Sequence, residues 1–143
     1  AQQSLIAAGV QSSACCAGLQ QASLTLDVKP LFGLQPLISY KCVWLQWVLM
    51  YLNDIDLIVF LTRVREELLS SADDGVVIVK DNVSHTPDVD FWDEDDHSLT
   101  RTSTHFQSLF TVAGFQTIMT RTQDGFPDDL WPVLFFVLKP ITS

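Results

Sequence analysis

Two short apolar runs, separated by an amphipathic segment, constrain most strongly what this chain can fold into. Residues 43–45 and 76–79 are apolar throughout, as expected of strands that are buried on both faces. Between them, apolar residues recur every three or four positions over residues 54–70, which predicts a helix that Asn53 and Asp54 cap at its start. The recurring residues are Leu57, Leu61, Val64 and Leu68. The order strand, helix, strand predicts a βαβ unit, and therefore an α/β fold with a parallel sheet.

The second half of the chain predicts one more helix and a closing pair of strands. The helix covers residues 102–113 and ends at Gly114, because glycine is common just beyond the C-terminus of a helix. Its inward-facing residues are Phe106, Leu109, Phe110 and Ala113. Residues 115–122 and 133–138 are predicted strands, and the short loop between them requires antiparallel pairing.

The composition argues against some classes of partner. With 143 residues, of which 48% are hydrophobic and 17% charged, the chain can bury the core of one domain. Its 17 acidic and 8 basic residues give a formal net charge of -9, which argues against nucleic acid and fits a cationic partner. The longest apolar run, residues 42–52, is about half of the ~20 residues that a membrane-spanning helix needs, so we expect no membrane partner. Cys15, Cys16 and Cys42 show neither metal-ligand nor disulfide spacing, so we expect no metal and a reducing compartment.

The first 40 residues differ from the rest of the chain. They contain only Asp27 and Lys29 as charged residues, and they begin with neither Met nor the basic and apolar regions of a signal peptide. We therefore expect the chain to begin inside a larger protein. Residues 1–143 would then form a partial domain, in which residues 1–40 are divergent or carry an insertion.

Polar residues gather where the predicted parallel strands end. Ligands of open α/β sheets bind beyond the carboxyl ends of the strands, where Gln46 and Trp47 follow the first strand and Lys80, Asp81 and Asn82 follow the second. A run of six carboxylates comes next, made up of Asp88, Asp90, Asp93, Glu94, Asp95 and Asp96.

This acidic run has two interpretations. As a run of charge alone it predicts a solvated loop. Phe91 and Trp92 interrupt it, however, and aromatic faces beside carboxylates suit an amine or a Lys side chain.

Four motifs in this half of the chain resemble those of the alpha-N-terminal protein methyltransferases. They are WLQWV (44–48), VKDNV (79–83), DEDDHSLTR (93–101) and QDGFP (123–127). The resemblance covers residues 41–140 in the family's order and spacing, and CCAGLQ (15–20) resembles a further stretch upstream. It implies a Rossmann-like class I methyltransferase sheet with helices on both faces and an antiparallel closing hairpin, whose N-terminal strands would lie upstream of Ala1. It also implies S-adenosylmethionine as the cofactor, the α-amine of proteins beginning X-Pro-Lys as the substrate, and the cytoplasm and nucleus as the location.

The resemblance further implies roles for single residues. Leu19, Gln20 and Gln46 would contact the cofactor. Asn82 would hydrogen-bond the substrate amine and Asp96 would help to deprotonate it, because a protonated amine cannot attack a methyl group. The family commonly has His where this chain has Tyr51, and a tyrosine hydroxyl is a poorer proton acceptor at neutral pH than an imidazole.

The other implied roles concern the substrate peptide. They are Trp47 in the substrate channel, Asp93 and Ser98 on the Lys that follows Pro, and Asp129, Leu130 and Trp131 along the peptide groove. Asp88 and Asp90 lie outside the matched motif, so we expect them to act only through their long-range field.

Structural interpretations of these residues remain open. Gln46 can satisfy backbone groups at a strand end, Trp47 can belong to the core, and Asn82 can cap a turn. Two other functions also remain open. No Gly-x-Gly occurs in the chain, which favours a non-catalytic scaffold in a larger assembly. A small-molecule methyltransferase would share the sheet, but the acidic run and Asn82 argue against it.

Overall fold

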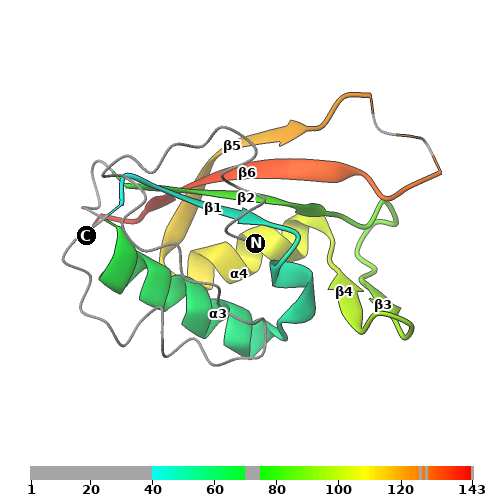
Figure 1. Ribbon diagram of the computed structural model, residues 1–143, viewed down its shortest axis with the longest axis horizontal. Coiled ribbons are helices and arrows are strands. Elements are labelled where there is room, and N and C mark those ends of the chain that lie inside the picture. Colours follow the sequence, from blue (N-terminus) through cyan, green and yellow to red (C-terminus); the bar gives the residue numbers. More distant parts are fainter. Residues whose placement is uncertain (1–39, 70–74, 126, 128, 143) are drawn as a thin grey trace, which may run out of the picture. The chain divides into compact units, whose positions relative to one another are not determined.

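The computed structural model describes residues 40–69, 75–125, 127 and 129–142 (Figure 1). The chain divides into two units, residues 1–35 and 36–143, and all described residues belong to the second unit. Its elements are β1 (Cys42–Gln46), α3 (Asp54–Arg63), β2 (Val76–Asn82), β3 (Phe91–Asp93), β4 (Ser98–Thr100), α4 (Ser103–Val112), β5 (Phe115–Thr122) and β6 (Val133–Pro140). A 3₁₀ turn, Leu49–Tyr51, precedes α3, and a π-helical turn, Val64–Leu68, follows it.

A mixed sheet of four strands in the order β1-β2-β6-β5 forms the centre of the fold. Strands β1 and β2 pair in parallel, which confirms the predicted βαβ unit. Strand β6 runs antiparallel to both β2 and β5, which confirms the predicted closing pair. The register places Gln46 opposite Lys80 and Asn82 opposite Val133, so the end of β1, the end of β2 and the start of β6 lie at one edge.

Both described helices cover the same face of this sheet (Figure 1). The residues predicted to face inward from the two helices are all buried, as are Val77, Val79 and Phe136 of the sheet. Phe106 and Phe110 of α4 pack against the ring of Phe136, with ring centroids 5.7 and 5.4 Å apart. Helices on the second face, which the resemblance implies, are not among the described elements.

The ends of the helices follow their local sequence. The Asn53 side chain accepts a hydrogen bond of 2.9 Å from the Asp56 N–H, as its predicted capping role requires. Gly114 follows α4 with φ +84, and a Cβ there would lie 1.7 Å from Nη1 of Arg65. The helix predicted over residues 54–70 is α-helical only to Arg63 and ends with the π-helical turn.

The acidic run contains a β-hairpin that the sequence analysis did not predict. Strands β3 and β4 pair antiparallel in a separate two-stranded sheet, and Asp93 lies opposite Ser98. His97, in the turn between them, has a positive φ of 57. The acidic run is therefore partly in regular β-structure and is not a solvated loop throughout.

Candidate functional site

A pocket of about 340 Å³ lies at the carboxyl edge of β1 and β2. Its lining residues are Trp47, Met50, Tyr51, Asn82, Leu130 and Trp131. They come from the ends of two strands, the 3₁₀ turn and the segment before β6. All of them except Met50 are site residues predicted from the sequence. The structure therefore brings these predicted residues together where ligands of open α/β sheets bind.

The end of strand β2 holds Trp47 in place. Its backbone N–H donates to the Lys80 carbonyl oxygen at 2.9 Å, and Nζ of Lys80 lies 4.5 Å from the centre of its ring. The φ of Trp47 is 49, in a region that bulky residues rarely adopt and that often marks functional sites. Because the side chain is 38% exposed, it is not the core residue of the structural interpretation.

A buried carboxylate lies next to Asn82. Asp81 is fully buried, its Oδ1 accepts a hydrogen bond from the Asn82 N–H at 2.9 Å, and its Oδ2 has no hydrogen-bond partner among the described residues. Burial raises the pKa of Asp81 from 3.8 to about 6. The N–H groups of Asn82, Leu49 and Met50 and the charge of Arg101 oppose this rise.

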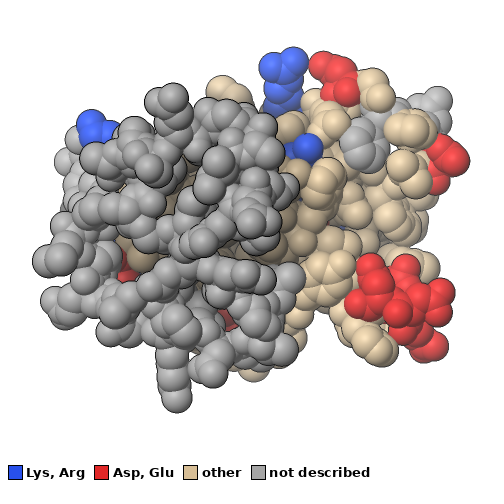
Figure 2. Space-filling view, in the orientation of Figure 1, with Lys and Arg blue, Asp and Glu red and all other residues tan. Residues whose placement is uncertain are grey.

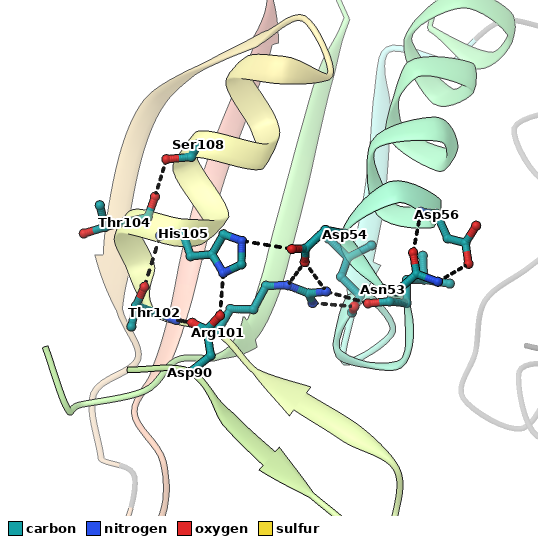
Figure 3. Close-up of polar contacts among 11 residues, drawn as sticks. Asn53, Asp54, Asp56, Asp90, Arg101, Thr102, Thr104, His105 and Ser108 are labelled. Atoms are coloured by element: carbon teal, nitrogen blue, oxygen red, sulfur yellow. Dashed lines mark hydrogen bonds and ion pairs between the residues drawn. The ribbon is translucent and has the colours of Figure 1, made fainter. Parts of the chain in front are cut away.

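The 3₁₀ turn that carries Tyr51 is held by a buried arginine. Arg101 is fully buried, and its guanidinium donates to the Leu49 carbonyl oxygen at 3.2 Å and to the Leu52 carbonyl oxygen at 2.6 Å (Figure 3). Its Nε also donates to Oδ1 of Asp54 at 3.0 Å. A buried guanidinium needs such partners, because an unpaired charge in the interior is strongly destabilising.

Acidic side chains gather over the β3–β4 hairpin (Figure 2). Asp93 accepts a hydrogen bond from the Asp95 N–H at 2.9 Å, and Asp96 accepts one from the Ser98 N–H at 3.0 Å. Ser98 is only 2% exposed, so its hydroxyl is not open to a ligand in this conformation. None of these residues lines the pocket.

Aromatic side chains connect the hairpin to the pocket. The Trp131 ring, which lines the pocket, lies 5.4 Å from the Phe91 ring and 4.7 Å from the His85 ring, measured between centroids. Phe91 is the first residue of β3, so one pocket wall continues directly into the acidic hairpin. Of the two aromatic residues in the acidic run, Phe91 contacts the pocket wall, whereas the Trp92 ring lies near the His97 ring.

The expectation that Asp90 acts only through its long-range field is wrong. Its Oδ1 accepts a hydrogen bond from the Thr102 N–H at 2.8 Å, and its Oδ2 lies 2.5 Å from Nδ1 of His105 (Figure 3). Asp90 is half-buried because it joins the start of α4 to the segment before β3. Asp88 is exposed, and no contact of its carboxylate is found in the described part of the chain.

The remaining predicted residues either do not line the pocket or lie outside the described residues. Oε1 of Gln46 accepts a hydrogen bond from Nε1 of Trp44 at 3.1 Å, so this side chain is partly used within its own strand. Asp129 is exposed and does not line the pocket. Leu19 and Gln20 lie outside the described residues.

The described residues contain neither a cluster of metal ligands nor a membrane-spanning helix. No group of three or more His, Cys, Asp or Glu side chains among them could hold a metal ion. None of the helices formed by these residues has the length and apolar character needed to cross a membrane.

Comparison with known proteins identifies the family. The model of the AdoMet dependent proline di-methyltransferases matches residues 17–139. The chain belongs to this family. It is 36% identical over 101 residues to alpha N-terminal protein methyltransferase 1 of Dictyostelium discoideum, which covers 71% of this chain and 36% of the relative. It is 32% identical over 124 residues to N-terminal Xaa-Pro-Lys N-methyltransferase 1-A of Xenopus laevis, which covers 87% of this chain and 48% of the relative.

Solved structures agree with this assignment. A SAM-dependent methyltransferase from Leishmania major matches with a TM-score of 0.63 and 31% identity over 71% of this chain and 39% of its own. The 1,6-didemethyltoxoflavin-N1-methyltransferase of Burkholderia thailandensis, with a TM-score of 0.60 and 14% identity over 71% of this chain and 44% of its own, shows the fold alone. The chain thus spans between about a third and a half of the length of these relatives. Membership of the AdoMet dependent proline di-methyltransferases does not favour the non-catalytic scaffold.

Several residues that shape the site were not predicted from the family motifs. Arg101 ends the DEDDHSLTR motif, but no pattern in the sequence predicts its hydrogen bonds to the turn before α3. Met50 lines the pocket because it belongs to the same 3₁₀ turn as Tyr51. A signal did exist for Asp81, which continues the alternation of Val77 and Val79 on the buried face of β2.

Proposed function

We propose that this chain carries the substrate-binding part of a methyltransferase that transfers methyl groups from S-adenosylmethionine to the α-amine of proteins beginning X-Pro-Lys. The observation that carries the proposal is the pocket at the carboxyl edge of the sheet, lined by Trp47, Tyr51, Asn82 and Trp131. Its wall continues through Phe91 into an acidic hairpin. This arrangement suits a peptide that has uncharged side chains near its start and a cationic Lys at its third position.

Asn82 of the pocket and Asp96 of the hairpin act on the amine. An α-amine with a pKa near 8 is mostly protonated at neutral pH, so it must lose a proton before it can attack. The amide oxygen of Asn82 accepts a hydrogen bond from the amine and holds it in line for attack. Tyr51 is a weak proton acceptor, so the Asp96 carboxylate takes the proton, either directly or through water.

The hairpin and the aromatic side chains hold the rest of the peptide. Asp93 pairs with the Lys at the third position, and its partial burial strengthens that ion pair relative to a fully exposed one. The rings of Trp47 and Trp131 pack against the Pro and against the aliphatic part of the first residue.

The described residues fit one part of S-adenosylmethionine. Gln46 lies half-buried at the carboxyl end of β1, and its amide nitrogen is a donor of the kind that heteroaromatic ring nitrogens accept. Leu19 and Gln20 would hold the adenine together with it. When bound, the cofactor supplies a methyl group on a sulfonium, which needs no metal. No Gly-x-Gly is present in the 143 residues to hold its methionine end.

A first prediction follows for the cofactor. The 143-residue chain by itself should bind S-adenosylmethionine weakly, with a Kd of about 1 mM or higher, because only the adenine end finds residues that fit it. Isothermal titration calorimetry measures this affinity directly. Binding in the micromolar range would contradict the prediction, and would mean that other residues of the chain hold the ribose and methionine ends.

A second prediction separates Asp93 from its acidic neighbours. Asp93→Asn should weaken binding of an X-Pro-Lys peptide by about 5- to 30-fold, because the Lys loses its carboxylate partner. The same change should have little effect on an X-Pro-Gln peptide, since that peptide has no charge to lose. The affinities of the four combinations form a double-mutant cycle.

Asp88→Asn is the matched control for this cycle. Asp88 is exposed with a φ of 59, a conformation that Asn also adopts readily, so the change removes only charge. It should weaken binding slightly, and less at high salt. Additive effects of the Asp93 and Lys changes would exclude contact between the two groups.

A third prediction concerns proton acceptance by Asp96. Asp96→Asn should lower kcat by about 10-fold in the natural protein while peptide affinity stays within a few-fold, because the amide cannot take a proton. Initial rates and peptide titrations measure the two effects separately. Unchanged kcat would exclude Asp96 as the acceptor.

The reaction itself is tested by mass spectrometry of peptides incubated with the natural protein and S-adenosylmethionine. A free X-Pro-Lys peptide should gain methyl groups on its first residue, and the same peptide with an acetylated N-terminus should gain none. Methylation of the acetylated peptide on Lys would contradict the proposed function.

We also propose that the protein works in the cytoplasm and nucleus. Within the described part of the chain, Cys42 is an exposed free thiol, which supports a reducing compartment.

A further inference from the structure

A chain of polar contacts joins the turn that carries Tyr51 to the base of the β3–β4 hairpin. It begins at the turn that carries Tyr51, where Arg101 binds the Leu49 and Leu52 carbonyl oxygens, and it continues from Arg101 to Asp54. It ends at Asp90, the residue directly before Phe91 of β3. Phe91 contacts Trp131, which lines the pocket, at 5.4 Å between ring centroids.

The middle link of this chain is a histidine between two carboxylates. His105 lies in the first turn of α4, and its ring points between Asp54 and Asp90 (Figure 3). Nε2 is 3.2 Å from Oδ2 of Asp54 and Nδ1 is 2.5 Å from Oδ2 of Asp90. An ionised carboxylate only accepts, so each of these hydrogen bonds requires a proton on the facing ring nitrogen, and only the doubly protonated ring makes both at once. In that form the ring connects α3 to the base of the hairpin.

The burial of these groups favours one defined arrangement. Arg101 is fully buried, and the side chains of His105 and Asp90 are 30% and 25% exposed. Partly buried, charge-assisted hydrogen bonds have preferred distances and angles, so the network restricts how the hairpin can tilt. A purely apolar contact between the same elements would restrict it less, because dispersion has no preferred direction.

We propose that His105 is a positioning residue for substrate, which sets the distance between the turn carrying Tyr51 and the hairpin carrying Asp93 and Asp96. This inference rests on the proposed function. His105 itself does not touch the substrate, because it does not line the pocket. It acts through Asp90 on the hairpin and through Asp54 and Arg101 on the turn.

The first test compares His105→Leu with His105→Lys in the natural protein. His105→Leu should weaken binding of an X-Pro-Lys peptide by about 5- to 30-fold, because the hairpin is no longer tied to α3. His105→Lys should restore affinity to within about three-fold, since an ammonium can donate to both carboxylates. The matched control is Gln107→Leu, because Gln107 is exposed on the same helix and its side chain bonds only to Ser103 among the described residues.

The second test is hydrogen exchange, which distinguishes positioning from a general loss of stability. In His105→Leu, amides of residues 91–100 should exchange faster while those of β2 and β6 keep their rates. Equal acceleration in β2 and β6 would overturn the inference, because it would mean that His105 only stabilises the fold. Normal peptide affinity of His105→Leu, or an equal loss in Gln107→Leu, would also overturn it. If the unsubstituted protein fails to bind the peptide, the proposed function fails and the inference fails with it.

Discussion

Asn82→Ala should lower the turnover of the natural protein by about 30- to 1000-fold, with little change in cofactor affinity. The side chain lies at the end of β2 and lines the pocket, where its amide can orient the substrate amine. A lost orienting hydrogen bond is worth about 2–4 kcal/mol in the transition state. Single-turnover rates, measured beside the affinities for peptide and cofactor, separate the loss of turnover from a loss of binding.

Asn53→Ala is the matched control for this prediction. Asn53 caps α3 through its hydrogen bond to the Asp56 N–H and does not line the pocket. Its loss should lower the free energy of unfolding by about 1 kcal/mol without the loss of turnover. Near-normal turnover of Asn82→Ala would leave Asn82 with only the structural role of capping a turn.

Periodicity made the sheet and helices predictable. The stripe that begins at Leu57 has helical spacing, and only its inward face is buried, which is the condition under which such a stripe predicts a helix. The short loop before β6 likewise leaves only antiparallel pairing with β5. Both predictions depend on contacts within one element or between neighbouring ones.

The pocket was predictable for a different reason. The end of each parallel strand lies at the same edge, so Trp47 and Asn82 must be neighbours whatever their side chains do. The resemblance to the family, which covers residues 41–140, added Tyr51, Leu130 and Trp131, which no pattern in the chain itself would have placed there. Periodicity and resemblance therefore supplied separate parts of the same site.

The hairpin and the polar network could not be predicted from pattern. Strands β3 and β4 have three residues each. Three residues within or beside a run of charged residues are too few to show the alternation of apolar and polar residues that predicts a strand. The partners of Arg101 lie 47 to 52 positions away from it in sequence. His105 contacts Asp90, and the whole hairpin lies between these two residues in sequence. Asp90 was consequently expected to act only through its long-range field, although its carboxylate accepts a hydrogen bond from the N–H of Thr102, the residue that caps α4.

The alternation along β2 buries Asp81, which makes the free energy of unfolding depend on pH. Asp81 lies on the same buried face as Val77 and Val79, and burial raises its pKa from 3.8 to about 6. Between these two values the folded protein holds a proton on Asp81 that the unfolded chain has released. The free energy of unfolding therefore falls as the pH rises through this window.

Asp81→Asn removes this dependence, because an amide does not titrate. We expect the free energy of unfolding of the wild type, relative to Asp81→Asn, to be about 2–3 kcal/mol lower at about pH 7.5 than at about pH 4. Urea denaturation of both proteins across this range measures the difference. Asp88→Asn, at an exposed position, measures the general effect of removing one of the negative charges.

A difference that does not change with pH would contradict this prediction. It would mean that the opposing groups, namely the N–H groups of Asn82, Leu49 and Met50 and the charge of Arg101, fully offset the burial of the carboxylate. A difference of the expected sign would instead mean that an ionised Asp81 is retained at neutral pH despite its energetic cost. Its Oδ1 accepts a hydrogen bond from the backbone N–H of Asn82, so under the proposed function the carboxylate would help to place the residue proposed to orient the substrate amine.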